Sequence, residues 1–245
     1  MKIETTENTL VFGQRHISYK LQRSERRNLR IVVSPDLSVN VFAPKSLTEC
    51  ATVMAVQKKG PWVAKTLDRM ADFHPLPSPK QYVSGETFVY LGRQYRLRVE
   101  EGRATPAKLR GRFLCIRVPD KNETRRVRRA VEKWYEERAN EILLGRLKVL
   151  HGIGARNGIP ACTMSIRRMR TRWGSCTARG FVTLNMDLVQ APIHCAEYVI
   201  MHELCHLVHH NHSRAFYRLL TRCMPDWQKR KRILDQIALP HRRDI

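Results

Sequence analysis

Two histidines and a glutamate lie within one short stretch of the C-terminal part of the chain, in the order His202-Glu203-Leu204-Cys205-His206. In a helix, residues four apart project from the same face, so both imidazoles can reach one point while Glu203 lies beside them. Imidazole is a common ligand of zinc, and a carboxylate next to a zinc site can take a proton from water. The spacing therefore predicts a metal-dependent hydrolytic site with His202 and His206 as ligands and Glu203 as the general base.

The surrounding residues predict that this motif lies on a buried helix. Residues 192–210 begin with Pro192, which suits the first turn of a helix, and apolar residues then surround most of the helix axis. Burying three ionisable side chains together costs several kcal/mol unless they have a partner, and a divalent cation removes that cost. The apolar residues are Ile193, Ala196, Val199, Ile200, Leu204, Leu207 and Val208.

A catalytic zinc ion needs a third protein ligand and an open position for water. No glutamate follows His206, so a downstream glutamate is excluded as this ligand, whereas Asp226 and Asp235 remain candidates. His209 shares a face with His202 but lies about 10 Å further along the helix axis, which is too far for both to bind one ion. The third ligand is therefore expected after a turn in the chain.

A turn is expected directly after this helix, and it contains a histidine. Asn211 tolerates the left-handed conformation that ends helices, and Ser213 is a typical N-cap of a following helix. His212 lies at this corner, where the chain can fold back, and we predict it as the third ligand. His209 and His210 are expected to be solvated or to support the ligands.

The predicted site holds one Zn2+ ion through His202, His206 and His212. Three neutral imidazoles leave zinc Lewis-acidic, and Glu203 would take a proton from the water that attacks the substrate. We expect this chemistry to hydrolyse a peptide bond, which predicts a zinc metallopeptidase with a peptide or protein as its substrate.

The N-terminal part of the chain is expected to be rich in strands. A capping box of Ser46 and Glu49 predicts a helix that ends before Gly60-Pro61, and a second helix is expected from Trp62. Three prolines within residues 73–80 predict an extended connector. Strands are predicted at residues 16–23, 29–34, 39–43, 87–91, 94–99 and 113–118.

Residues 119–245 are expected to form the metal-binding core, after a β-rich portion that comprises residues 1–118. Apolar residues at helical spacing from Asn122 to Leu150 predict a long amphipathic helix. Residues 165–173 and 181–185 predict a β-hairpin beside the metal site, whose edge either binds an extended peptide or is an ordinary edge strand blunted by arginines. The predicted fold class is α+β.

The chain is strongly basic, with 45 lysines and arginines against 22 acidic residues, a net charge of +23 and a pI near 10.4. The charge is spread along the chain and is not confined to a tail. Two basic runs, residues 125–129 and 228–232, are candidate phosphate contacts, although such runs are usually solvated faces. A nucleic acid is therefore kept as a candidate partner.

Cysteine usage and hydropathy indicate the compartment. The seven cysteines are scattered and never spaced C-x-x-C, so neither a disulfide framework nor a cysteine zinc cluster is expected. The first residues, MKIETTENTL, lack the apolar core of a secretory signal, and no stretch approaches about 18 uninterrupted apolar residues. We expect a cytoplasmic protein with no membrane span.

Several motifs of the chain occur together and in this order in one known family. Through them the chain resembles the YgjP-like metallopeptidase family over most of residues 165–227, and weaker N-terminal features extend the resemblance over nearly the whole chain. The stronger motifs are Arg172-Trp173-Gly174-Ser175-Cys176, Leu184-Asn185, residues 198–206 and Asn211-His212-Ser213, with Phe216 and Pro225; the weaker ones are Arg26-Arg27, Ala43-Pro44, Trp62 and Tyr90-Leu91-Gly92.

The resemblance implies a minimal zincin fold and supports His212 as the third ligand. We also expect Arg172, Trp173 and Asn185, which belong to the shared motifs, to contact the substrate. The spacing from His206 to His212 fits the metzincin pattern as well, but the glycine that lets a metzincin helix bend is His209 here.

The YgjP-like family is also similar to the SprT-like and WLM-type zinc proteases, which act on proteins attached to DNA. Together with the positive charge, this similarity favours a nucleic-acid-associated protease as an alternative function. A nucleic-acid-binding protein whose zinc is only structural is the other alternative.

Overall fold

The computed structural model describes residues 5–34, 36–71, 74, 78–169 and 172–237. The chain forms two compact units, Met1–Ser78 and Pro79–His241. Helices and three small sheets are both present, which confirms the α+β fold class. Much of the expected connector at residues 73–80 lies outside the described residues.

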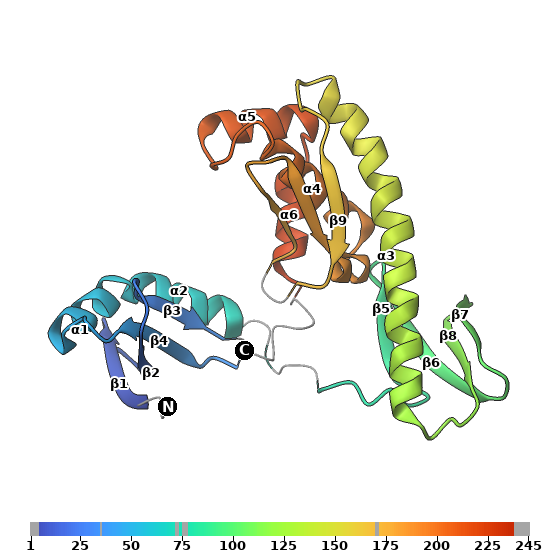
Figure 1. Ribbon diagram of the computed structural model, residues 1–245, viewed down its shortest axis with the longest axis horizontal. Helices are drawn as coiled ribbons and strands as arrows, with labels where there is room; N and C mark the ends of the chain where they lie inside the picture. The colour runs from blue at the N-terminus through green and yellow to red at the C-terminus, as the bar shows by residue number, and fades with distance from the viewer. Residues whose placement is uncertain (1–4, 35, 72–73, 75–77, 170–171, 238–245) are drawn as a thin grey trace. The chain divides into compact units, whose positions relative to one another are not determined.

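The first unit is a four-stranded sheet with two helices, α1 (Glu49–Lys58) and α2 (Gly60–Ala71), along one face (Figure 1). Alternate residues of β2 are buried, so one face of the sheet forms the core with the helices. Strands expected at residues 16–23, 29–34 and 39–43 are confirmed as β2, β3 and β4, while β1 was not predicted. The strands are β1 (Thr5–Phe12), β2 (Arg15–Ser24), β3 (Arg30–Val33) and β4 (Val39–Pro44), in the order β1-β2-β4-β3.

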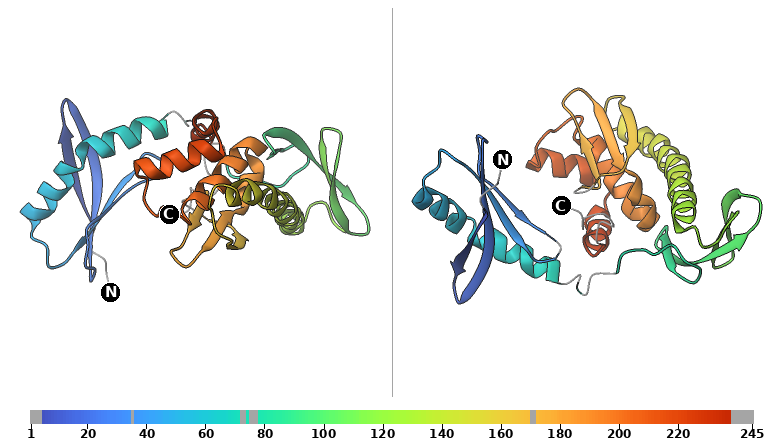
Figure 2. Two further views of the ribbon diagram at one scale, coloured as in Figure 1. Left: turned by 90° about the horizontal axis from the view of Figure 1, so that it is seen from above. Right: turned by 60° about the horizontal axis from the view of Figure 1, so that its bottom comes forward.

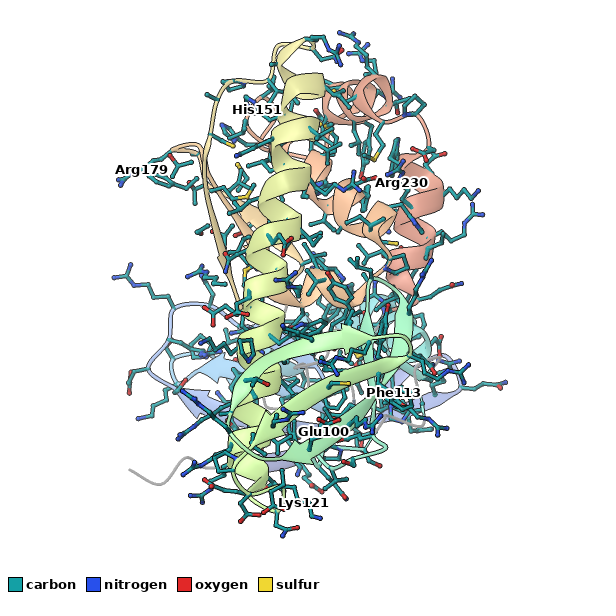
Figure 3. All side chains as sticks on the ribbon, turned by 90° about the vertical axis from the view of Figure 1, so that its right-hand side faces the viewer. Glu100, Phe113, Lys121, His151, Arg179 and Arg230 are labelled. Atoms are coloured by element: carbon teal, nitrogen blue, oxygen red, sulfur yellow. The ribbon has the colours of Figure 1, made fainter. Side chains whose placement is uncertain are left out.

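The second unit begins with another four-stranded sheet, which is followed by the 32-residue helix α3 (Thr124–Ala155). In both views of Figure 2 this sheet lies at one end of α3 and the C-terminal elements lie at the other. Figure 3 places Lys121 near the beginning of α3 and His151 near its end. The strands are β5 (Thr87–Tyr90), β6 (Arg93–Glu101), β7 (Thr105–Arg110) and β8 (Phe113–Val118), in the order β5-β6-β8-β7.

The turn between β5 and β6 attaches this sheet to the rest of the second unit. The amide of Leu91 donates to the carbonyl of Val189 at 2.7 Å, and that of Gly92 to Gln190 at 3.1 Å. Gly92 has a φ of +77°, and a Cβ there would lie 2.8 Å from Pro192, so a glycine is required. Because β5–β8 share a core with the C-terminal helices, the units divide at Ser78 and not at residue 118, where the sequence led us to expect the boundary.

The C-terminal part of this unit contains a three-stranded sheet and three α-helices. β9 (Thr163–Arg167), β10 (Gly174–Cys176) and β11 (Phe181–Asn185) lie in the order β10-β11-β9. β9 is parallel to β11, so the hairpin is formed by β10 and β11, not by the long strand expected at residues 165–173. The helices are α4 (Ile193–Cys205), α5 (Arg214–Cys223) and α6 (Trp227–Asp235), after the short 3-10 helix η1 (Met186–Gln190).

The side chain of Asn185 accounts for the interrupted strand. Its Nδ2 donates to the carbonyls of Met169 at 2.7 Å and Arg172 at 3.0 Å, and its Oδ1 accepts from the amides of Met169 at 3.2 Å and Asp187 at 3.1 Å. These bonds tie Met169 and Arg172 to the end of β11, and the strand expected at residues 165–173 ends as β9 at Arg167. Residues 170–171 of this segment lie outside the described residues.

Candidate metal centre

The helix α4 holds the His-Glu-x-x-His motif in the middle of the second unit. It contacts α3, α5, α6, β10 and β11, and its residues Ala196, Ile200 and Leu204 have no exposed surface. The α-helix ends with His206 as its C-cap, earlier than the end expected at residue 210. The shorter helix lets the chain turn back, so that residue 212 approaches α4.

Three imidazoles meet at this turn. The ligand nitrogens of His202, His206 and His212 all lie within 4.8 Å of one another, and the Nε2 atoms of His202 and His212 are 3.0 Å apart. Zinc–nitrogen bonds of about 2.0–2.1 Å in a tetrahedron require nitrogens roughly 3.3 Å apart, so the three rings fit one ion with little movement. His202 and His206 are partly buried and His212 is exposed, which leaves the site open on one side.

The ring of Phe216 packs against all three imidazoles. It has no exposed surface, and its ring centroid lies 5.0, 4.6 and 4.8 Å from those of His202, His206 and His212. Phe216 is held there because α5 begins at the N-cap Ser213, whose Oγ accepts a hydrogen bond from the Phe216 amide at 3.5 Å. The expected N-cap at Ser213 is confirmed, and it fixes the corner that carries His212.

Hydrogen bonding and burial favour the neutral, metal-binding form of two of the imidazoles. Nδ1 of His206 lies 2.9 Å from the carbonyl of His209; because a carbonyl only accepts, Nδ1 carries the proton and Nε2 keeps its lone pair. Burial, together with the neighbouring His206 and His212, lowers the pKa of His202 to about 3. Burial also lowers the pKa of His206. Neutral imidazoles are the form that binds metal, so His202 and His206 are in the protonation state that a cation needs.

Glu203 is a buried carboxyl on the same helix. Its side chain is only 7% exposed, and burial raises its pKa to about 7, while the positive charge of Arg172 acts in the opposite direction. A carboxyl with a pKa near the working pH of an enzyme can both accept and return a proton, which suits a general base.

The three residues expected to contact substrate occupy different environments. Arg172 is exposed and acts on Glu203 through its charge, and Trp173 is partly buried against the core. Asn185 has no exposed surface, and its amide is engaged by the main chain of the neighbouring loop. Asn185 therefore ties Met169 and Arg172 to the end of β11, and of the three expected residues it is Arg172 that presents an exposed polar side chain beside the site.

Asp226 and Asp235, the alternative ligands left open by the sequence, form ion pairs on α6. Asp226 pairs with Arg230, and Asp235 pairs with Lys231, in both cases along α6. Arg230, labelled in Figure 3, also donates to Glu197 at 2.6 Å and so ties α6 to α4. Within the described residues, the metal-ligand grouping at this site consists of histidines alone.

Two aromatic neighbours of the histidines were not recognised as part of the site from the sequence. In the sequence Phe216 was named only among the motifs of the family resemblance, although its position three residues after the expected N-cap Ser213 places it in the first turn of a helix, next to the corner. Tyr198 stands one turn before His202 on α4, with its hydroxyl 3.5 Å from Nδ1 of that histidine. The four-residue spacing that brings side chains onto one helix face applies to Tyr198 and His202, whereas His212 lies before the N-cap of α5.

A buried helix with two imidazoles four residues apart, a third imidazole from the next turn and a buried carboxyl beside them defines a site of the metal-dependent hydrolase type. Comparison with protein families matches residues 27–237 to the family described as YgjP-like, metallopeptidase domain. The chain belongs to the YgjP-like metallopeptidase family, as its motifs indicated. Comparisons with curated proteins and with solved structures gave no match.

Proposed function

We propose that this member of the family is a zinc-dependent peptidase in which His202, His206 and His212 hold the metal. The observation that carries this proposal is the convergence of the three imidazoles on one point, next to the buried carboxyl of Glu203. A zinc ion bound there would act as a Lewis acid that makes water nucleophilic near neutral pH.

Other residues of the chain would orient the ligands and transfer the proton. His206 is oriented through the carbonyl of His209, and Phe216 supports all three rings from below. Glu203, on the flank of the same helix, takes the proton from the attacking water and later returns it to the leaving amine.

We propose that the substrate is an extended segment of a peptide or protein that lies along β10. This strand is at the edge of its sheet, and it packs against α4, which carries Glu203. The main-chain groups on the outer edge of such a strand can pair with an added strand, which gives affinity with little dependence on sequence. Arg172, exposed just before β10, is suited to contact an acidic or carbonyl group of the bound chain.

The test uses purified protein loaded with zinc and an unfolded protein such as casein. Glu203→Gln is expected to keep one zinc per chain while lowering the hydrolysis rate by about 10²–10⁴-fold. His206→Ala is expected to lose both zinc and hydrolysis. Glu136→Gln on the exposed face of α3 is the matched control and should behave like the wild type. Turnover at the wild-type rate in Glu203→Gln would rule out the assigned base.

The charge of +23 favours a second candidate, in which the peptidase acts on proteins bound to nucleic acid. In the two basic runs, Arg126, Arg128, Arg230 and Lys231 pair with carboxylates, while exposed cations such as Arg125 remain for phosphate. Salt-dependent binding to DNA together with DNA-stimulated cleavage would favour this candidate. Zinc binding and DNA binding without turnover on any unfolded protein would favour a structural zinc instead.

We also propose a cytoplasmic location. All seven cysteines are free thiols, which suits a reducing compartment. Within the described residues, no helix combines the length and the apolar character needed to cross a membrane.

A further inference from the structure

Gly174, the first residue of β10, lies unusually close to the side chain of Glu203. A Cβ added to Gly174 would be 2.7 Å from Cγ, 2.7 Å from Oε1 and 2.9 Å from Cδ of Glu203. Carbon atoms in well-packed proteins stay about 3.5–4.0 Å apart, so no side chain fits at this position while Glu203 stays where it is. All three of the nearest atoms belong to one residue, the candidate general base.

Hydrogen bonds to Asn185 and to β11 fix the strand that carries Gly174. The main-chain amide of Asn185 donates to the carbonyl of Trp173 at 2.8 Å, and its side chain donates to the carbonyl of Arg172 at 3.0 Å. Gly174 itself pairs with Leu184 of β11, which has no exposed surface. Because the two residues before Gly174 and its partner strand are held, β10 cannot easily retreat from α4.

The side chain of Glu203 is therefore the part that yields if a methyl group is added to residue 174. It ends in rotatable bonds, whereas its backbone lies in α4 between the buried residues Met201 and Leu204. A displaced carboxyl would leave the flank of the imidazole site, and the three imidazoles would keep their places on α4 and at the corner before α5.

We propose that Gly174 is a positioning residue: its bare main chain sets the place of the Glu203 carboxyl beside the metal site. This inference rests on the proposed role of Glu203 as the base. It gives the glycine of the Arg172–Cys176 motif a definite task, since Gly174 shows no left-handed φ that would otherwise require a glycine. Misplacing a catalytic group by about 1 Å can slow a reaction by roughly 10²-fold, so the absence of a single methyl group has a large effect.

The first experiment compares Gly174→Ala with Gly152→Ala. A Cβ on Gly152, on α3, meets nothing within 4 Å, which makes this variant the matched control. Gly174→Ala is expected to lower kcat by about 10²-fold with little change in KM, and to bind zinc as tightly as the wild type. Gly152→Ala should keep the wild-type kcat. Unchanged kcat in Gly174→Ala would overturn the inference.

A double-mutant cycle on thermal unfolding tests the same contact without any substrate. Glu203→Ala removes Cγ, Cδ and both carboxylate oxygens, so the space needed by a methyl group at residue 174 becomes free. Gly174→Ala is expected to lower the melting temperature by several degrees in the wild-type background, and by less than half as much in the Glu203→Ala background. An equal loss in both backgrounds, or no loss in either, would overturn the inference.

This cycle separates the two proposals. Coupling between the two positions in a protein that cleaves no peptide would support the contact between Gly174 and Glu203 and count against the peptidase function. If Gly174→Ala alone does not fold, folding of the double variant is the supporting result, and failure of both to fold is the contrary one.

Discussion

Phe216 offers a direct way to test how the three imidazoles are held. Its ring is fully buried and lies 4.6–5.0 Å from each of them, measured between ring centroids. Removing a buried phenylalanine side chain costs about 3–5 kcal/mol. At about 2–4 °C per kcal/mol for a unit of this size, Phe216→Ala should lower the melting temperature of the metal-free protein by about 6–20 °C.

The same substitution should weaken metal binding. Without the ring, the imidazoles can turn into the space beneath them, and loss of such supporting contacts typically lowers metal affinity by about 10–100-fold. Circular dichroism on the metal-free protein measures the melting temperature, and competition with a chromophoric chelator measures the zinc affinity. The zinc affinities are measured below the melting temperature of the variant, so that only folded protein is compared.

Leu220→Ala is the matched control for Phe216→Ala. Leu220 lies one turn further along α5 and is equally buried, so its loss should cost about 2–5 kcal/mol of stability. Its zinc affinity should nevertheless stay close to that of the wild type. Equal affinity losses in the two variants, or an unchanged affinity in Phe216→Ala, would refute the supporting role of the ring.

Two further predictions concern the corner and the loop beside the site. His212→Ala should lower zinc affinity by at least about 10-fold and keep the melting temperature of the metal-free protein within about 2 °C of the wild type, because the side chain is exposed; a large loss of stability in the metal-free protein would contradict this. Asn185→Ala removes the side-chain partner of the main-chain carbonyls of Met169 and Arg172, two part-buried hydrogen bonds worth about 0.5–1.5 kcal/mol each, so urea unfolding should show a loss of at least about 1 kcal/mol. An Asn185→Ala variant as stable as the wild type would show that Asn185 does not hold the loop.

The grouping of the three histidines could be anticipated from the sequence because its geometry is mostly local. Two histidines four residues apart on a helix must share a face, and the Asn211–Ser213 corner brings a third histidine back toward them. The end of α4 was placed too late, because apolar Leu207 and Val208 continue the helical pattern although the chain already turns after Cys205. Turning at that point is what allows His212 to reach the other two rings.

Elements held by long-range contacts were harder to anticipate. β1 and β7 are edge strands with few buried residues; β1 lacks the alternation of apolar and polar residues that marks a strand, and in β7 the alternation covers only residues 107–110 after Pro106. The hydrogen bonds that hold Met169 and Arg172 come from the buried side chain of Asn185, which lies on another strand. The boundary between the units was misplaced for the same reason, since the hydrogen bonds from Leu91 and Gly92 to η1 join segments far apart in the chain.

The corner between α4 and α5 has one more consequence. Two of the three candidate ligands are carried by α4, while the third stands just before α5, so a bound ion would act as a cross-link between the last helices of the chain. Under the zinc site proposed above, removal of the ion would take this cross-link away and leave α4 and the corner before α5 joined through the chain alone.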